Sequence, residues 1–190
     1  EKIESKIEEV KNLSSIVIVI GGIAAYPAII KESDNPRQLF LTFSHEWLHH
    51  YLIFYPLRRS YFSDIKMKEV NETLANIFSE RLLADLCLKD FELKKEICFV
   101  REKEKNTFDY SNFMKNLRIE VDALLFEGKI LKAEKLMDEA TYILKSNGYN
   151  VRKINQAWFA FNGTYADSPS STSNIDKELL NFIDSQTSIK

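Results

Sequence analysis

Histidines and cysteines are scarce in this 190-residue sequence, and no dense basic run occurs. The three histidines, His45, His49 and His50, all fall within six residues, so histidine chemistry is confined to one segment. The formal net charge is −2, and a chain without a basic run lacks the positive surface that binds nucleic acid. We therefore expect no nucleic-acid partner.

The two cysteines exclude a cysteine-based metal or redox site. Cys87 and Cys98 do not have the Cys-x-x-Cys spacing of such sites, and no histidine lies close to them in the sequence. They are either free thiols in the core or one disulfide, and the sequence leaves both alternatives open.

An uninterrupted hydrophobic run long enough to cross a membrane is also absent. Residues 14–30 approach the minimum length of a membrane span, but Gly21, Gly22 and Pro27 interrupt them. Residues 16–20 are rich in β-branched side chains, which favours a buried strand. The two glycines then end this strand or let its backbone pass close to another group. We expect no membrane span within this chain.

What the sequence does contain is enough apolar residues for a core, 45% of the chain, and this predicts a single domain over residues 1–190. Helical spacing of apolar residues, N-cap signals and terminal glycines predict helices over residues 1–13, 36–55, 67–88, 108–126, 129–146 and 175–183. Loops are expected over residues 57–66 and 91–105. The predicted fold is mostly helical α+β: residues 1–90 form a small sheet and two long helices, and residues 107–190 form a C-terminal helical layer.

The histidine segment contains the motif His-Glu-x-x-His. On a helix, His45 and His49 are four residues apart, so both imidazoles lie on one face and can bind one metal ion. Glu46 lies beside the first histidine; in this motif zinc lowers the pKa of a water, and the glutamate takes its proton. His50 points away from this face and is expected to be structural or to line the cleft. The alternative is a pair of histidines in the core.

Zinc needs a third protein ligand, with its fourth position left for water. Because no further histidine is present, this ligand must be a carboxylate; the downstream candidates are Asp64, Glu69, Glu72 and Glu80. We favour Glu72, because apolar residues flank it on the inward side of its predicted helix. Asn76 lies one turn further on the same face and can hydrogen-bond a ligating imidazole.

These residues resemble the gluzincin metallopeptidases, in which His-Glu-x-x-His on one helix is joined by a glutamate on a later helix. His45 to His49 match the first part, and Glu72 to Asn76 match the second, with Asn76 where the family usually has aspartate. The resemblance spans residues 36–88. It implies a minimal zincin-like fold with a zinc ion, and a peptide or protein as substrate.

A looser resemblance connects the chain with uncharacterised prokaryotic proteins of the His-Glu-x-x-His type. It is carried by residues 45–51, 71–73 and 155–161. Such proteins look exported or membrane-anchored, so the resemblance implies an extracytoplasmic protein. Because this sequence starts at Glu1 rather than at methionine, we expect any anchor to lie in a segment absent from this chain.

Peptide hydrolysis also needs a donor that stabilises the oxyanion. We select Tyr165, because the turn over residues 162–164 can present its hydroxyl to a cleft. The other candidates are Tyr51, Tyr61, His50 and Arg118, although Arg118 and Asp122 have the spacing of an ordinary helical ion pair.

The sequence therefore predicts a zinc metallopeptidase with Glu46 as general base and His45, His49 and Glu72 as metal ligands. Two alternatives stay open. One is an enzyme that keeps the zinc but hydrolyses a different amide. The other is a non-catalytic zincin-like domain that binds a partner or ligand through its cleft.

Overall fold

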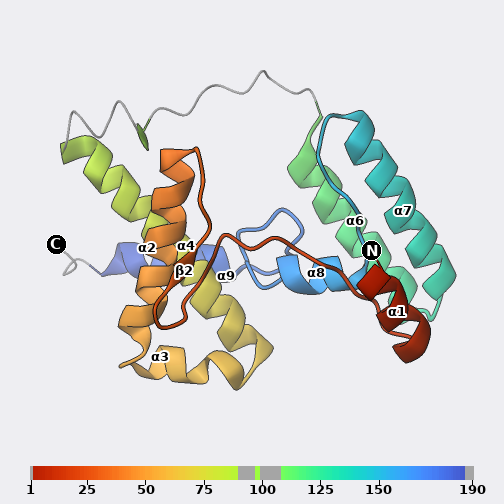
Figure 1. Cartoon of the computed structure of the whole chain (residues 1–190), viewed down its shortest axis with the longest axis horizontal. Helices are drawn as coiled ribbons and strands as arrows, with labels where there is room; N and C mark the ends of the chain where they lie inside the picture. Colours follow the sequence, from red (N-terminus) through yellow and green to blue (C-terminus); the bar gives the residue numbers. More distant parts are fainter. Residues whose placement is uncertain (1, 90–96, 99–107, 187–190) are drawn as a thin grey trace. The chain divides into compact units, whose positions relative to one another are not determined.

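The computed structural model describes residues 2–89, 97–98 and 108–186 (Figure 1). In this part of the chain the secondary structure is mostly helical, with one antiparallel sheet of two strands, as expected for a mostly helical α+β fold. The elements are α1 (Lys2–Lys11), β1 (Gly22–Ile23), β2 (Ile29–Ile30), α2 (Pro36–Leu52), α3 (Pro56–Arg59), the 3-10 helix η1 (Ser60–Phe62), α4 (Ile65–Lys89), α6 (Tyr110–Phe126), α7 (Ile130–Ser146), α8 (Gln156–Asn162) and α9 (Ile175–Ser185).

Contacts divide the chain into two compact units, and each unit combines segments that are far apart in the sequence. The first unit consists of Glu1–Ile18 and Asn106–Ser173, and the second of Val19–Lys105 and Asn174–Lys190. The N-terminal helix α1 therefore groups with α6, α7 and α8, whereas the last helix, α9, groups with α2 and α4. The sequence predicted that the chain divides between residues 90 and 107. It did not predict that each end of the chain belongs to the unit formed mainly by the other half.

The second unit is built on α2 and α4, which pack side by side (Figure 1). Helix α2 begins as predicted: Pro36 is its first residue, and the side chain of Asn35 accepts a hydrogen bond of 3.2 Å from the backbone N–H of Gln38. The fully buried Ala75 of α4 has a small side chain that allows close packing. This pairing of helices brings the histidine motif to the predicted glutamate helix.

The expected loop over residues 57–66 is wrong, because most of it is helical. Pro56 starts α3, and η1 follows without a break before α4 begins at Ile65. Proline suits the first position of a helix, where its missing N–H is not needed. The Ser60 hydroxyl donates 2.7 Å to the carbonyl of Leu57, which supports the turn. Helix α2 accordingly ends at Leu52, before the predicted residue 55.

The strand predicted over residues 16–20 is also wrong. The strands are β1 and β2, which pair Gly22 with Ile30 and Ile23 with Ile29. The backbone of Val17 binds side chains rather than a neighbouring strand. The N–H of Val17 donates a hydrogen bond of 2.5 Å to the carboxylate of Glu4, and its carbonyl accepts one of 3.2 Å from Arg152. These partners satisfy the backbone without a sheet, so the β-branched side chains did not decide the structure.

The first unit contains the antiparallel helix pair α6 and α7, which match the helices predicted over residues 108–126 and 129–146 (Figure 1). Gly128 and Gly148, at φ +72° and +82°, follow the two helices in the left-handed conformation that glycine adopts without strain. The core cluster of this unit consists of Met114, Leu117, Val121, Ala133, Met137, Ala140, Leu144, Ile154 and Phe159. Helix α8 contributes Phe159, so the aromatic stretch near residue 160 is part of this core.

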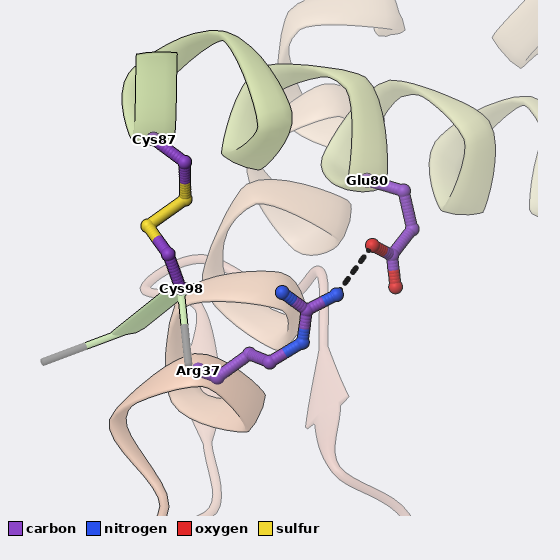
Figure 2. Close-up of a disulfide and its surroundings, with 4 residues drawn as sticks. All are labelled: Arg37, Glu80, Cys87 and Cys98. Carbon is purple, nitrogen blue, oxygen red and sulfur yellow. Dashed lines mark hydrogen bonds and ion pairs between the residues drawn. A yellow bond between two sulfur atoms is a disulfide. The ribbon is translucent and has the colours of Figure 1, made fainter. Parts of the chain in front are cut away.

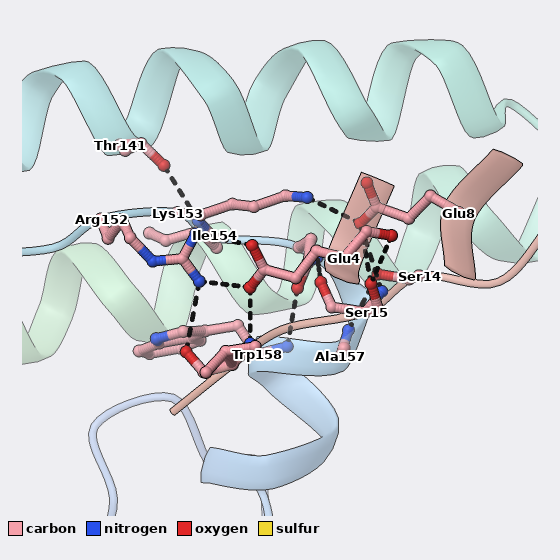
Figure 3. Close-up of polar contacts among 12 residues, drawn as sticks. Glu4, Glu8, Ser14, Ser15, Thr141, Arg152, Lys153, Ile154, Ala157 and Trp158 are labelled. Carbon is pink, nitrogen blue, oxygen red and sulfur yellow. Dashed lines mark hydrogen bonds and ion pairs between the residues drawn. The ribbon is translucent and has the colours of Figure 1, made fainter. Parts of the chain in front are cut away.

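Helix α1 is held to the first unit by ion pairs, shown in Figure 3. Arg152 binds the buried carboxylate of Glu4 with both of its terminal nitrogens, and Lys153 lies 2.7 Å from Glu8. The residue that follows, Ile154, donates its N–H 3.1 Å to the hydroxyl of Thr141 on α7. Residues 152–154 thus connect α1 to the helix pair.

Cys87 and Cys98 form a disulfide, one of the two alternatives that the sequence left open (Figure 2). Cys87 lies near the end of α4. On the same helix Glu80 forms an ion pair of 2.8 Å with Arg37 of α2. Apart from residues 97 and 98, the expected loop over residues 91–105 lies outside the described residues. In the described ranges, no helix has both the length and the apolar character needed to cross a membrane.

Candidate metal centre

The two histidines of the motif face each other across one turn of α2. The ring centroids of His45 and His49 are 4.8 Å apart, and their Nε2 atoms are separated by 3.1 Å. His49 is buried and His45 is largely buried. Two imidazole nitrogens directed at the same point are expected of ligands to one ion.

Glu72 of α4 completes the group. Its Oε2 lies 3.2 Å from Nε2 of His45 and 3.5 Å from Nε2 of His49. Across the described residues, these three side chains make up the one group that offers at least three histidine, cysteine or carboxylate ligand atoms close enough to hold a metal ion. The other candidates are not in it: Glu80 pairs with Arg37, and Asp64 accepts 3.1 Å from the N–H of Lys66 at the start of α4.

The separations within this group fit a metal ion. Ligand atoms about 2.1 Å from a tetrahedral zinc ion lie roughly 3.4 Å from one another. The observed separations are 3.1, 3.2 and 3.5 Å. The donor set of two imidazoles and one carboxylate is also one that zinc accepts, with one position left for another ligand. The group can therefore hold a metal ion.

Asn76 orients the first imidazole. Its Oδ1 lies 2.9 Å from Nδ1 of His45, one turn of α4 beyond Glu72. Because an amide oxygen can only accept, Nδ1 carries the proton of this hydrogen bond, and Nε2, which faces His49 and Glu72, is the nitrogen available to a metal ion. Asn76 stands at the position where the gluzincin metallopeptidases, which this motif resembles, usually have aspartate. By contrast, Nδ1 of His49 is buried and has no hydrogen-bond partner among the described residues.

Tyr61 holds the other oxygen of the carboxylate, a role that the sequence did not reveal. Its hydroxyl donates 2.5 Å to Oε1 of Glu72, and its ring lies edge-on to His49 with centroids 6.2 Å apart. The guanidinium of Arg58 lies 4.3 Å from the centroid of the Tyr61 ring. From the sequence, Tyr61 was expected in a loop and was one of the candidates for the oxyanion donor. Its contact with Glu72 depends on how η1 folds against α4, which local sequence patterns do not reveal.

The contacts within this group stabilise the ionised form of Glu72 and the protonated form of His45. Burial acts to raise the pKa of Glu72, but hydrogen bonds from His45, His49 and Tyr61 outweigh it and hold this pKa well below its usual value. Burial acts to lower the pKa of His45, but its hydrogen bond to Glu72 and the nearby carboxylates raise it overall. A divalent cation bound here would meet the same negative carboxylate.

Glu46 lies under strand β1. The residue is only 8% exposed, and its carboxylate is near enough to His45 to act on the charge of the imidazole. A Cβ atom placed on Gly22 would lie 2.7 Å from Cγ and 2.8 Å from Oε1 of Glu46, so the glutamate side chain would have to shift. Gly22 therefore lets the strand pass directly over the carboxylate, which is the close approach considered for the two glycines.

The remaining candidates are held in other ways. His50 has the structural role expected of it, since its Nε2 donates 2.7 Å to the carbonyl of Ala25. The hydroxyl of Tyr51 lies 2.9 Å from that of Tyr55 on the exposed side of α2.

Two candidates for the oxyanion donor belong to the first unit. Arg118 forms the expected ion pair with Asp122 at 2.7 Å. Tyr165 follows α8, and its ring packs edge-on against Phe161 with centroids 6.2 Å apart. The selection of Tyr165 stays a prediction.

Comparison with known proteins found no match: no protein-family model, no curated protein and no solved structure is significantly similar to this chain. The functional argument therefore depends on the residues of the site.

Proposed function

We propose that this protein is a zinc-dependent metallopeptidase whose metal ligands are His45, His49 and Glu72. The observation that carries the proposal is the convergence of these three ligand atoms within 3.5 Å, next to the buried carboxylate of Glu46. Two histidines with a purely structural role in the core would not require a third group at the same point. Here Glu72 directs Oε2 toward both imidazoles, and Tyr61 holds its other oxygen. A glutamate beside such a donor set is the arrangement that zinc peptidases use.

In the proposed reaction the metal and the side chains have different roles. When bound, zinc supplies a Lewis acid for the scissile carbonyl and lowers the pKa of a water. Glu46 takes the proton from the attacking water and later gives it to the leaving amine. Asn76 keeps Nε2 of His45 free for the metal, and Tyr61 keeps Oε2 of Glu72 turned toward the histidines.

Strand β1 supports a peptide as substrate. The described sheet has two strands, so one edge of β1 has no strand partner within it. Gly22 brings this short strand against Glu46, and an extended peptide added at its edge would lie next to the general base. A zincin-like fold, with a sheet edge, a motif helix and a glutamate helix, is part of the same proposal.

The disulfide supports an extracytoplasmic location, which we also propose. Bonds such as that between Cys87 and Cys98 form and persist in oxidising compartments and are rare in the cytosol of most organisms.

The test is Glu46→Gln, compared with the wild-type chain for metal content and for digestion of a peptide library. We expect both proteins to contain about one zinc per chain by elemental analysis, and only the wild type to cleave peptides, since glutamine cannot accept the proton. Cleavage by the Gln variant would contradict the mechanism. A wild-type chain that binds zinc and cleaves no peptide would instead favour the non-catalytic domain or another amide as substrate.

A further inference from the structure

One end of the second unit exposes large apolar side chains from three turns. This is the end at which α2 finishes and α4 begins, around α3 in Figure 1. Phe54 follows α2 and is 79% exposed, whereas Phe62 and Ile65, at the junction of η1 and α4, are 88% and 80% exposed. The hairpin between β1 and β2 is fixed at the same end, because His50 binds the carbonyl of Ala25.

The hairpin adds a third apolar turn, since Tyr26, next to Ala25, is fully exposed. We call the set of Tyr26, Phe54, Phe62 and Ile65 the apolar end. Exposed apolar residues that occur singly need no explanation, but several at one end of a unit indicate a surface that another body covers.

Basic residues lie close in sequence to Phe54, Phe62 and Ile65 of the apolar end. Residues 53–68 contain four basic residues and one acidic residue, a formal charge of +3, in a chain whose net charge is −2. The four are Arg58, Arg59, Lys66 and Lys68. None of them forms an ion pair with an acidic side chain of the described ranges. Arg58 and Lys68 lie over the ring of Tyr61, whereas Arg59 and Lys66 are exposed, so the charge of these two is available to a partner.

We propose that the apolar end docks on an anionic lipid surface. Aromatic and aliphatic side chains on turns can enter the headgroup layer, while arginine and lysine beside them bind lipid phosphates. The core of a protein interface is usually depleted of charge and shaped to one partner. Several separate exposed apolar turns with the exposed Arg59 and Lys66 close by in the sequence match the surface of an anionic lipid layer better than a protein pocket.

A second exposed apolar turn serves as the comparison. Phe126 lies at the turn between α6 and α7 of the first unit and is 94% exposed. The neighbouring Lys129 forms an ion pair with Glu127, so the positive charge next to this turn is already paired. Phe126→Ser is therefore the matched control for Phe54→Ser.

The experiment is co-sedimentation of the whole chain with phosphatidylcholine vesicles, with and without phosphatidylglycerol. We expect the wild type to sediment with the anionic vesicles, less with the neutral ones, and less again at high salt. Phe54→Ser should weaken binding about tenfold, as expected for the loss of one buried phenylalanine, and Phe126→Ser should leave it unchanged. The double variant Arg59→Glu, Lys66→Glu should weaken binding to anionic vesicles by at least about tenfold.

Circular dichroism will show that each variant is folded, and Ile65→Ser provides a second apolar variant if Phe54→Ser is not. Absence of sedimentation with anionic vesicles would overturn the proposal, as would an equal loss in Phe54→Ser and Phe126→Ser. Binding to neutral and anionic vesicles alike would overturn the role of the basic residues. None of these measurements depends on metal binding or on peptide cleavage.

Discussion

At the scale of single residues, the metal group depends on two side chains that do not touch the metal position themselves. Asn76 sets the proton of His45, and Tyr61 holds Oε1 of Glu72, so that Oε2 points toward both histidines. Asn76 follows from the sequence, because it lies one turn from Glu72 on the same helix. Tyr61 does not, because its contact with Glu72 depends on how η1 folds back on α4.

Removing the Tyr61 hydroxyl should weaken metal binding. In Tyr61→Phe, Glu72 loses the 2.5 Å hydrogen bond that fixes its carboxylate, and loss of such a partner typically lowers metal affinity about 10–100-fold. Competition with a chromogenic chelator measures the dissociation constant for zinc. The matched control is Tyr51→Phe, whose hydroxyl bonds only to Tyr55 among the described contacts. Equal affinity in the two variants would show that Tyr61 does not position Glu72.

Adding a methyl group at Gly22 should displace the general base. The new Cβ would lie 2.7 Å from Cγ of Glu46, so the Glu46 side chain must move. We expect Gly22→Ala to lower kcat by at least about tenfold, since a small misplacement of a catalytic group is costly, while zinc content stays the same. Gly21→Ala is the control, because its Cβ would meet Thr42 at a milder 3.3 Å. Full activity in Gly22→Ala would contradict the role of Glu46.

At the scale of elements, the long helices could be predicted, whereas the short helices α3, η1 and α8 and the strands could not. Helix α2 follows from Asn35 and Pro36, and the ends of α6 and α7 follow from Gly128 and Gly148, because caps act through neighbours in the sequence. Residues 16–20 were predicted as a strand from their β-branched side chains. Their backbone partners, Glu4 and Arg152, lie far away in the sequence, and no local pattern could reveal them.

The pairing of α2 with α4 should depend on metal. Without an ion, Glu72 and the two histidines are buried at this helix interface with fewer partners for their charge. Zinc at about 100 times its dissociation constant would stabilise the folded chain by about 2.7 kcal/mol. We therefore expect chelation to lower the melting temperature by several degrees in differential scanning calorimetry.

The control for chelation is Glu72→Gln, which keeps the shape of the side chain but removes its charge. Its melting temperature should change less between zinc and chelator than that of the wild type. If chelation leaves the wild type unchanged, the helix pair does not depend on metal for its stability.

At the scale of the whole molecule, acid should weaken the first unit through α1. The hydrogen bonds from Arg152 and from the N–H of Val17 lower the pKa of Glu4 from 4.5 to about 2, and Lys153 lowers that of Glu8 (Figure 3). A carboxyl whose pKa is lower in the folded than in the unfolded chain stabilises the fold above pH 4.5. This contribution is lost as the pH falls from 4.5 toward 2.

The measurement is the free energy of unfolding by urea between neutral pH and the acid limit. We expect it to decrease in the wild type over this acid range. Glu4→Gln should show a smaller decrease, because glutamine has no carboxyl group that takes up a proton in this pH range. A wild type and a Gln variant with identical pH profiles would show that the pair with Arg152 does not stabilise α1.

The division of the chain into two units has a practical consequence for cutting the protein into parts. The chain passes from one unit to the other after residues 18, 105 and 173. A truncation at any one of these points separates α1 or α9 from the unit to which it belongs, so an isolated N-terminal or C-terminal half should misfold. To separate the units, the second would have to be expressed as residues 19–105 joined by a new linker to residues 174–190, with the first assembled from the remaining two segments in the same way.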